Sequence, residues 1–263
     1  MMKTLFPKMK LHFHETGTGE PLILLHGLLG SHHNLLPQAE NFAKRFRVFA
    51  LDHRNHGLSP HADEFDYDVM AEDVMKFMRN QKLSQARFMG HSMGGKVAMR
   101  LAQLYPDAVA RLVVVDMSVH EYPPRYAAML DAMLALDLAA FKQRNEIDVA
   151  LEPVVASKTM RQFLLKNVGR DASGALFWKP NLHAIRANYD RIRGALPTGK
   201  PYDGPTLFVR GANSDYVRAT DLGLIRATFP RAELETIENA GHWVHAEAPE
   251  KFNALVGAFL TRQ

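Results

Sequence analysis

The stretch RFMGHSMGGKVAMRLA, residues 87–102, has glycines two positions before and two positions after Ser92. An apolar run typical of a buried strand ends at Gly90, and a helical pattern begins after the serine. A serine that only capped a helix would need neither Gly90 nor Gly94. A strand, a G-x-S-x-G turn and a helix in this order predict a sharp turn that exposes the serine hydroxyl at the carboxyl edge of a sheet.

Short apolar runs alternate with helical patterns on both sides of this stretch. The apolar runs predict strands at residues 9–15, 21–27, 46–52, 86–90, 110–116, 205–211 and 232–242. Apolar residues three or four positions apart predict helices at residues 34–44, 67–80, 93–104, 218–228 and 249–260. This alternation predicts an α/β fold with a mostly parallel sheet and helices on both faces.

The segment 118–196 interrupts the alternation. It is rich in Met and Leu at helical spacing and contains no predicted strand, so we expect an all-helical insertion. The core is then divided into a first part, residues 1–117, and a second part, residues 197–263. Met129 and Met133 recur at helical spacing within the insertion. They fit the core of the insertion, and adaptable apolar side chains that face a substrate would give the same pattern.

Composition narrows the function. The chain of 263 residues has no cysteine, which excludes a thiol nucleophile, a disulfide framework and a thiolate metal site. Its net charge of +4 comes from Lys and Arg scattered among 28 acidic residues, so no nucleic-acid partner is expected. No apolar run near the start is long enough for a signal peptide, and none elsewhere is long enough to span a membrane. We expect a cytoplasmic monomer or small homo-oligomer without a membrane partner.

A serine hydroxyl is a poor nucleophile near neutral pH, so the predicted turn requires a base. His242 follows the last predicted strand, and Gly241 gives its loop conformational freedom. His245 is the alternative, but we expect it to begin the descent into the last helix. We therefore predict that His242 is the base and that an acid precedes it in the chain.

An acyl-transfer site also needs two amides that point at the developing oxyanion. Met93, directly after the serine, supplies one. The other is expected from LLHGLLG, residues 24–30, where Gly27 lets the backbone turn and Leu28 N–H would face the serine. His26 and Gly27 are then expected to border the substrate.

Together these motifs resemble those of the α/β hydrolases over essentially the full chain. HGLLG, DHRNHGLS (52–59), GHSMGGK (90–96) and GHWVHAE (241–247) stand in the family order. The RNHG-x-S form of the second motif and the lysine of the third are most similar to small bacterial esterases and thioesterases. The resemblance implies an eight-stranded α/β-hydrolase core with a helical cap. It also implies hydrolysis of small-molecule acyl esters or thioesters without a cofactor.

The acid that orients the histidine has two candidates. Most family members carry it three residues beyond the glycine that ends the strand at 205–211, where this chain has Ser214 and Asp215 comes one step later. Asp116 ends the preceding apolar run, a place that some esterases of the same subgroup use. A buried aspartate is costly unless it is paired, and a histidine N–H is a suitable partner. We prefer Asp116, with Asp215 as the alternative.

The same residues are compatible with reactions other than ester hydrolysis. A serine at the turn argues against dehalogenases and epoxide hydrolases, which use a carboxylate nucleophile. Carbon–carbon bond hydrolysis, perhydrolysis, a lyase reaction and ligand binding without catalysis could use the same residues, and the fold alone does not separate them. Asp52 and Arg54 are expected to form an ion pair. The histidine-rich segments lack the spacing of a metal site, so no metal is expected.

Overall fold

The computed structural model describes residues 9–262. Its main sheet has the strand order β1-β3-β2-β4-β5-β8-β9, and only the β1–β3 pair is antiparallel. The strands are β1 (Phe13–Thr16), β2 (Glu20–Leu25), β3 (Phe46–Leu51), β4 (Ala86–His91), β5 (Val109–Val115), β8 (Thr206–Gly211) and β9 (Ala232–Ile237). The mostly parallel sheet is confirmed. The eight-stranded sheet is wrong for the described residues, because the seven apolar runs give seven strands.

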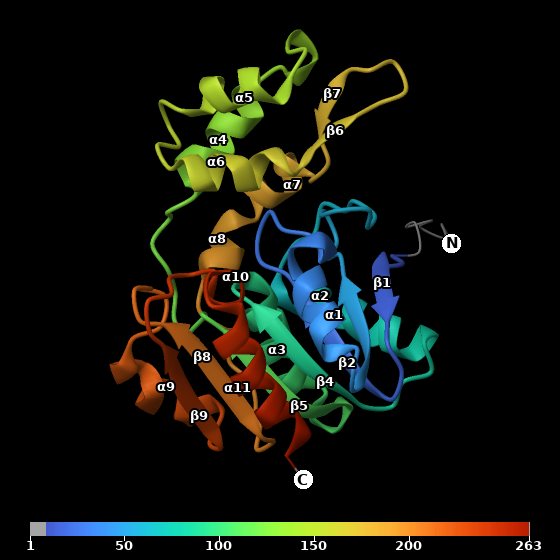
Figure 1. The fold of residues 1–263 in the computed structure, drawn as a ribbon, viewed down its shortest axis with the longest axis vertical. Coiled ribbons are helices and arrows are strands. Elements are labelled where there is room, and N and C mark those ends of the chain that lie inside the picture. Colours follow the sequence, from blue (N-terminus) through green and yellow to red (C-terminus); the bar gives the residue numbers. More distant parts are fainter. Residues whose placement is uncertain (1–8, 263) are drawn as a thin grey trace, which may run out of the picture.

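Helices cover both faces of this sheet (Figure 1). The core helices are α1 (Leu36–Phe42), α2 (Tyr67–Asn80), α3 (Met93–Leu104), α9 (Leu222–Thr228), α10 (Val244–Glu247) and α11 (Pro249–Thr261). Ile23 and Leu25 of β2 pack with α2 and α3, whereas Leu22 and Leu24 pack with α1 and α11. Because both faces are covered, the central strands are mostly apolar and buried, whereas the edge strands β1 and β9 also carry exposed polar side chains.

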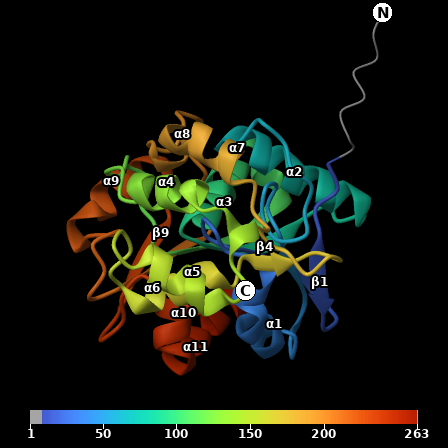
Figure 2. The ribbon, with the colours of Figure 1, turned by 90° about the horizontal axis from the view of Figure 1, so that it is seen from above.

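Residues 118–196, which we call the cap, leave the sheet after β5 and return before β8. The cap lies over the carboxyl edge of the sheet (Figures 1 and 2). Its helices are α4 (Ala127–Ala135), α5 (Arg144–Leu151), α6 (Lys158–Leu165), α7 (Leu182–Ala187) and α8 (Tyr189–Arg193). The cap therefore covers the edge at which the predicted serine turn lies.

The expectation of an all-helical insertion is wrong. The cap contains an antiparallel hairpin of β6 (Val168–Arg170) and β7 (Leu176–Trp178). Its turn is fixed by Asp171, whose Oδ1 accepts the N–H groups of Ser173 and Ala175. Strands of three residues are too short to show a period of two, so the pattern that identifies strands is missing here.

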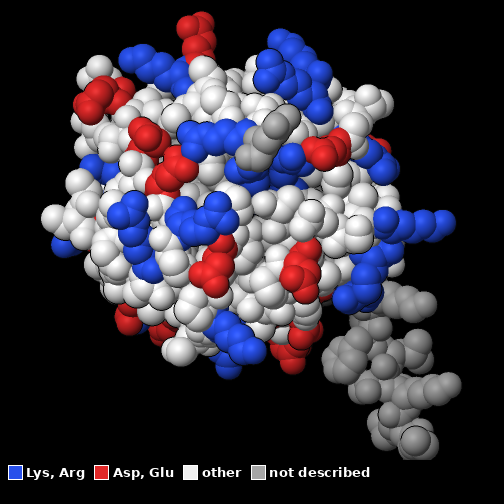
Figure 3. Space-filling view, turned by 90° about the horizontal axis from the view of Figure 1, so that it is seen from below, with Lys and Arg blue, Asp and Glu red and all other residues white. Residues whose placement is uncertain are grey.

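The face opposite the cap carries both basic and acidic side chains (Figure 3). Within residues 9–262, no helix combines the length and the apolar character needed to cross a membrane.

Candidate active site

The predicted serine turn joins β4 to α3. Ser92 has φ 54° and ψ −120°, a strained conformation for a residue with a side chain. A Cβ on Gly90 would lie 2.2 Å from the carbonyl oxygen of Gly94, and a Cβ on Gly94 would lie 2.3 Å from that of Leu25. Both glycines are therefore required by close backbone contacts, as the sequence predicted.

Three side chains from separate loops form a hydrogen-bonded chain at this turn. Ser92 Oγ lies 3.1 Å from His242 Nε2, and His242 Nδ1 lies 2.7 Å from Asp116 Oδ2. Asp116 is fully buried after β5, and His242 lies in the loop after β9. With Nδ1–H donated to Asp116, the lone pair on Nε2 faces the serine hydroxyl. This arrangement can remove a proton from Ser92.

The two candidate acids have different surroundings. Asp116 also accepts Gly211 N–H over 3.2 Å and the hydroxyl of Ser214. Asp215 turns outward, and its carboxylate accepts two bonds of 2.6 and 2.7 Å from Arg125. The hydrogen bonds from Arg125 lower the pKa of Asp215. The structure brings Asp116 to the histidine and leaves Asp215 in an exposed ion pair.

An aromatic side chain, Tyr216, packs against the histidine. The ring of Tyr216 stacks on His242 with centroids 3.8 Å apart, and its hydroxyl lies 2.6 Å from that of Tyr126. His245, the alternative base, packs against His91 instead, with ring centroids 4.6 Å apart. Burial lowers the pKa of His245 to about 4. Nothing in the local sequence pattern indicated the contact of Tyr216, because it depends on the path of the loop after β8.

The loop after β2 passes directly beside the serine. A Cβ on Gly27 would lie 3.2 Å from the Cβ of Ser92, so the backbone approaches it closely. Leu28 and Met93 both border a small cavity with Ser92, and neither N–H donates to another residue in the described range 9–262. Met93 begins α3, where the first N–H groups have no partner within the helix. Both amides are thus free to bind an oxyanion.

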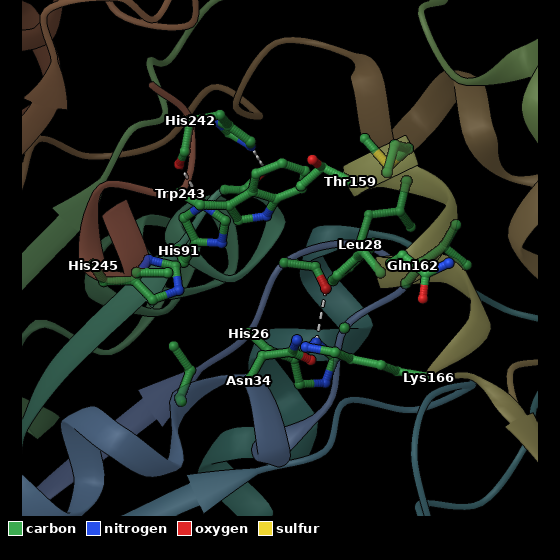
Figure 4. Close-up of a pocket in the computed structure, with 18 of the residues that line it drawn as sticks. His26, Leu28, Asn34, His91, Thr159, Gln162, Lys166, His242, Trp243 and His245 are labelled. Carbon is green, nitrogen blue, oxygen red and sulfur yellow. Dashed lines mark hydrogen bonds between the residues drawn. The ribbon is translucent and has the colours of Figure 1, made fainter. Parts of the chain in front are cut away.

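A cleft of about 870 Å³ lies between the core and the cap, next to the serine. Figure 4 shows Trp243 and His242 on the core side and Thr159, Gln162 and Lys166 on the cap side. Leu28, Met129 and Phe163 add apolar surface. Those lining residues make the cleft suitable for an apolar group with a polar end.

The residues predicted to border the substrate divide into two groups. His26, Gly27 and Met129 line the cleft. Met133 does not, because it is fully buried within the cap, where its carbonyl accepts the indole N–H of Trp178. The helical spacing of Met133 therefore reflects packing inside the cap.

The DHRNHGLS motif is structural rather than part of the cleft. The expected ion pair between Asp52 and Arg54 is wrong: Arg54 binds Asp73 over 2.6 and 2.9 Å. Asp52, His12 and His32 lie close enough together to hold a metal ion. However, the Asp52 carboxylate already accepts four N–H groups, two from the rings of His12 and His32 and two from the backbone at His32 and Leu58. Its acceptor positions are thus used by the protein itself.

Comparison with known proteins identifies the family. The sequence pattern of the α/β hydrolase fold matches residues 20–249. The chain belongs to the α/β hydrolase fold family. Among curated α/β hydrolases, it is 39% identical over 247 residues to the sn-1-specific diacylglycerol lipase ABHD11 of Mus musculus, covering 91% of this chain and 80% of that protein. It is 34% identical over 243 residues to esterase YbfF of Escherichia coli, covering 91% and 92%.

A solved structure of an α/β hydrolase agrees with these relatives. The "Marine microorganism esterase" superimposes with a TM-score of 0.93 at 38% identity, covering 96% of this chain and 100% of that one. The family resemblance inferred from the motifs is therefore confirmed, and so is the expectation of a carboxylic ester hydrolase.

Proposed function

We propose that this α/β hydrolase is a serine esterase that uses Ser92, His242 and Asp116 as its catalytic triad. The observation that carries the proposal is the continuous chain of hydrogen bonds from Ser92 through His242 to the buried Asp116. Two free amides, those of Leu28 and Met93, lie beside the same serine. Nucleophile, base, orienting acid and oxyanion donors are thus present together, as acyl transfer requires.

The reaction would proceed in two halves. His242 Nε2 takes the proton of Ser92 as Oγ attacks the acyl carbonyl, and the amides of Leu28 and Met93 bind the negative oxygen. The protonated His242 then gives its proton to the departing alcohol, which leaves an acyl group on Ser92. Water, deprotonated by the same histidine, then attacks the acyl carbonyl. The bond between the acyl carbon and Ser92 Oγ breaks, the acid leaves, and His242 returns the proton to Oγ. Asp116 stabilises the imidazolium in both halves.

The cleft supports esters that carry a sizeable apolar group. A volume of about 870 Å³ exceeds what an acetyl group needs, and Leu28, Met129, Phe163 and Trp243 provide apolar contacts. The name of the mouse relative, a diacylglycerol lipase, is in keeping with a lipid-like ester. Thioesters present the same acyl carbonyl to Ser92, so we include them in the proposed substrate class.

The test is hydrolysis of p-nitrophenyl acetate, butyrate, octanoate and palmitate by the wild type and by Ser92→Ala. We expect the wild type to prefer a chain longer than acetate and Ser92→Ala to lose at least about 10³-fold in kcat. A wild type inactive on all four esters would contradict the esterase proposal. Full activity in Ser92→Ala would show that another group is the nucleophile.

A further inference from the structure

The loop that carries Leu28 forms a tight turn with an unusual backbone at its third residue. Gly30 N–H donates to the carbonyl of Gly27 over 2.9 Å, so Leu28 and Leu29 are the central residues of the turn. Leu29 has a φ of 57°, a left-handed conformation usually found for glycine or asparagine. A leucine in this conformation is strained, so the surrounding structure must hold it in place.

A residue of the DHRNHGLS motif holds the N–H of this leucine. His56 Nε2 accepts Leu29 N–H over 3.1 Å, and His56 Nδ1–H donates to the carbonyl of Arg54 over 3.0 Å. Burial lowers the pKa of His56 to about 3, so its ring is neutral and Nε2 remains an acceptor near neutral pH. The ion pair of Arg54 with Asp73 fixes the motif in turn. The core thus secures one side of Leu29.

A residue of the cap holds the other side. Asn167, between α6 and β6, is 5% exposed, and its Nδ2 donates to the carbonyl of Leu29 over 2.7 Å. The carbonyl of Asn167 accepts the N–H of Lys179, which anchors it within the cap. The cap also contacts the motif itself, because Asn181 N–H donates to the carbonyl of Asn55 over 3.0 Å. Core and cap therefore meet at the two peptide groups of one strained residue.

We propose that the cap positions the oxyanion turn, with Asn167 holding the carbonyl of Leu29 while His56 holds its N–H. This inference rests on the proposed function, because the turn matters for catalysis only if Leu28 N–H binds an oxyanion. With both groups held, the turn keeps its left-handed residue, and Leu28 N–H stays directed at the space beside Ser92. Asn167 and His56 touch no part of the cleft, so they are positioning residues. Full stabilisation of the oxyanion then requires the contact between Asn167 of the cap and the carbonyl of Leu29.

The experiment compares two cap asparagines that each donate to a core carbonyl. Asn167 binds the turn, and Asn188 Nδ2 binds the carbonyl of Asp63 over 2.9 Å, outside the turn. For Asn167→Ala and Asn188→Ala, kcat and KM are measured on p-nitrophenyl butyrate. The Kd of butylboronic acid, which forms a tetrahedral adduct with an active serine, is measured as well. Asn167→Asp has the same shape without the amide donor and serves as a second variant.

We expect Asn167→Ala and Asn167→Asp to lower kcat about tenfold at nearly unchanged KM. This loss is smaller than the roughly 10²–10³-fold cost of deleting an oxyanion donor. The boronic acid should bind more weakly by a similar factor, because its adduct resembles the transition state. Asn188→Ala should stay within about twofold of the wild type. The pH profile of kcat should not shift, because His242 is untouched.

Equal kcat and equal boronate affinity in the Asn167 and Asn188 variants would overturn the inference. A lower melting temperature in Asn167→Ala with unchanged boronate affinity would also overturn it, because it would indicate a purely structural role. Failure of the proposed function looks different, since the wild type itself would neither hydrolyse the ester nor bind the boronic acid at Ser92.

Discussion

The loops that follow the neighbouring parallel strands β5 and β8 each carry an aspartate near His242, the proposed catalytic base. In the loop after β5, Asp116 is fully buried and holds three donors, the ring N–H of His242, the backbone of Gly211 and the hydroxyl of Ser214. In the loop after β8, Asp215 points to the surface and pairs with Arg125 of the cap. Both aspartates follow a strand of the parallel sheet, but one carboxylate is buried and the other is exposed.

This difference shows what a carboxylate needs in order to orient a histidine. An orienting acid must stay ionised out of water, which requires donors that are already in place. Two such donors reach the aspartate of the neighbouring loop: Gly211 N–H from the last residue of β8 and the Ser214 hydroxyl from the loop that follows. Ser214 stands where most family members are expected to carry the acid itself. The two loops thus build one carboxylate site together.

The largest expected effect comes from Asp116→Asn. An amide has a single acceptor oxygen for the three donors that Asp116 binds. When its NH2 group faces Nδ1, it donates to that nitrogen, so the ring carries its proton on Nε2 and no longer accepts the proton of Ser92. We expect kcat/KM for p-nitrophenyl butyrate to fall by about 10³–10⁴-fold. Near-UV circular dichroism should match the wild type, as a control for folding. A decrease in kcat/KM of less than about tenfold would contradict the role of Asp116 as the acid that orients His242.

Ser214→Ala should have an intermediate effect. It removes one donor to the Asp116 oxygen that also binds His242, and the remaining bonds of the carboxylate stay in place. We expect a three- to tenfold decrease in kcat/KM, equivalent to about 0.6–1.4 kcal/mol. Ser214→Thr, which keeps the hydroxyl, is the matched control and should retain more activity. Equal losses of kcat/KM in the two variants would show that the Ser214 hydroxyl does not support Asp116.

Asp215→Asn should have the smallest effect, with kcat/KM within about twofold of the wild type. The ion pair with Arg125 is exposed, so its loss should cost less than about 1 kcal/mol of unfolding free energy. Arg125 lowers the pKa of Asp215 below its ordinary 3.8, so this stabilisation is present above pH 3.8 and disappears as the pH falls through the lowered pKa. Urea denaturation of both proteins at pH 7 and in acid measures the difference. A variant that unfolds more easily only in acid would contradict this account.

The parts of the molecule that the sequence predicted are those set by local patterns. The strand–turn–helix at Ser92 follows from the glycines at positions 90 and 94, whose close backbone contacts exclude side chains. The parallel sheet follows from apolar runs that alternate with helical patterns. The position of His242 follows from its place after the last strand.

The parts that the sequence did not predict depend on contacts between distant segments. The sequence alone left Asp116 and Asp215 open, because only the path of the two loops shows which carboxylate turns inward. Asn167 and Leu29 are 138 residues apart, and no pattern in the cap sequence indicates their hydrogen bond. The partner of Arg54 was predicted wrongly for the same reason, since Asp73 lies on α2. Local spacing carries no information about such pairs.

We propose that Ser92 is activated through His242 by the buried Asp116 and not by Asp215. The most direct measurement is the second-order rate constant for covalent labelling of Ser92 by a fluorophosphonate, followed by intact-protein mass in the wild type, Asp116→Asn and Asp215→Asn. We expect labelling at the wild-type rate in Asp215→Asn and labelling at least about 10²-fold slower in Asp116→Asn. Slow labelling in Asp215→Asn together with near wild-type labelling in Asp116→Asn would contradict it.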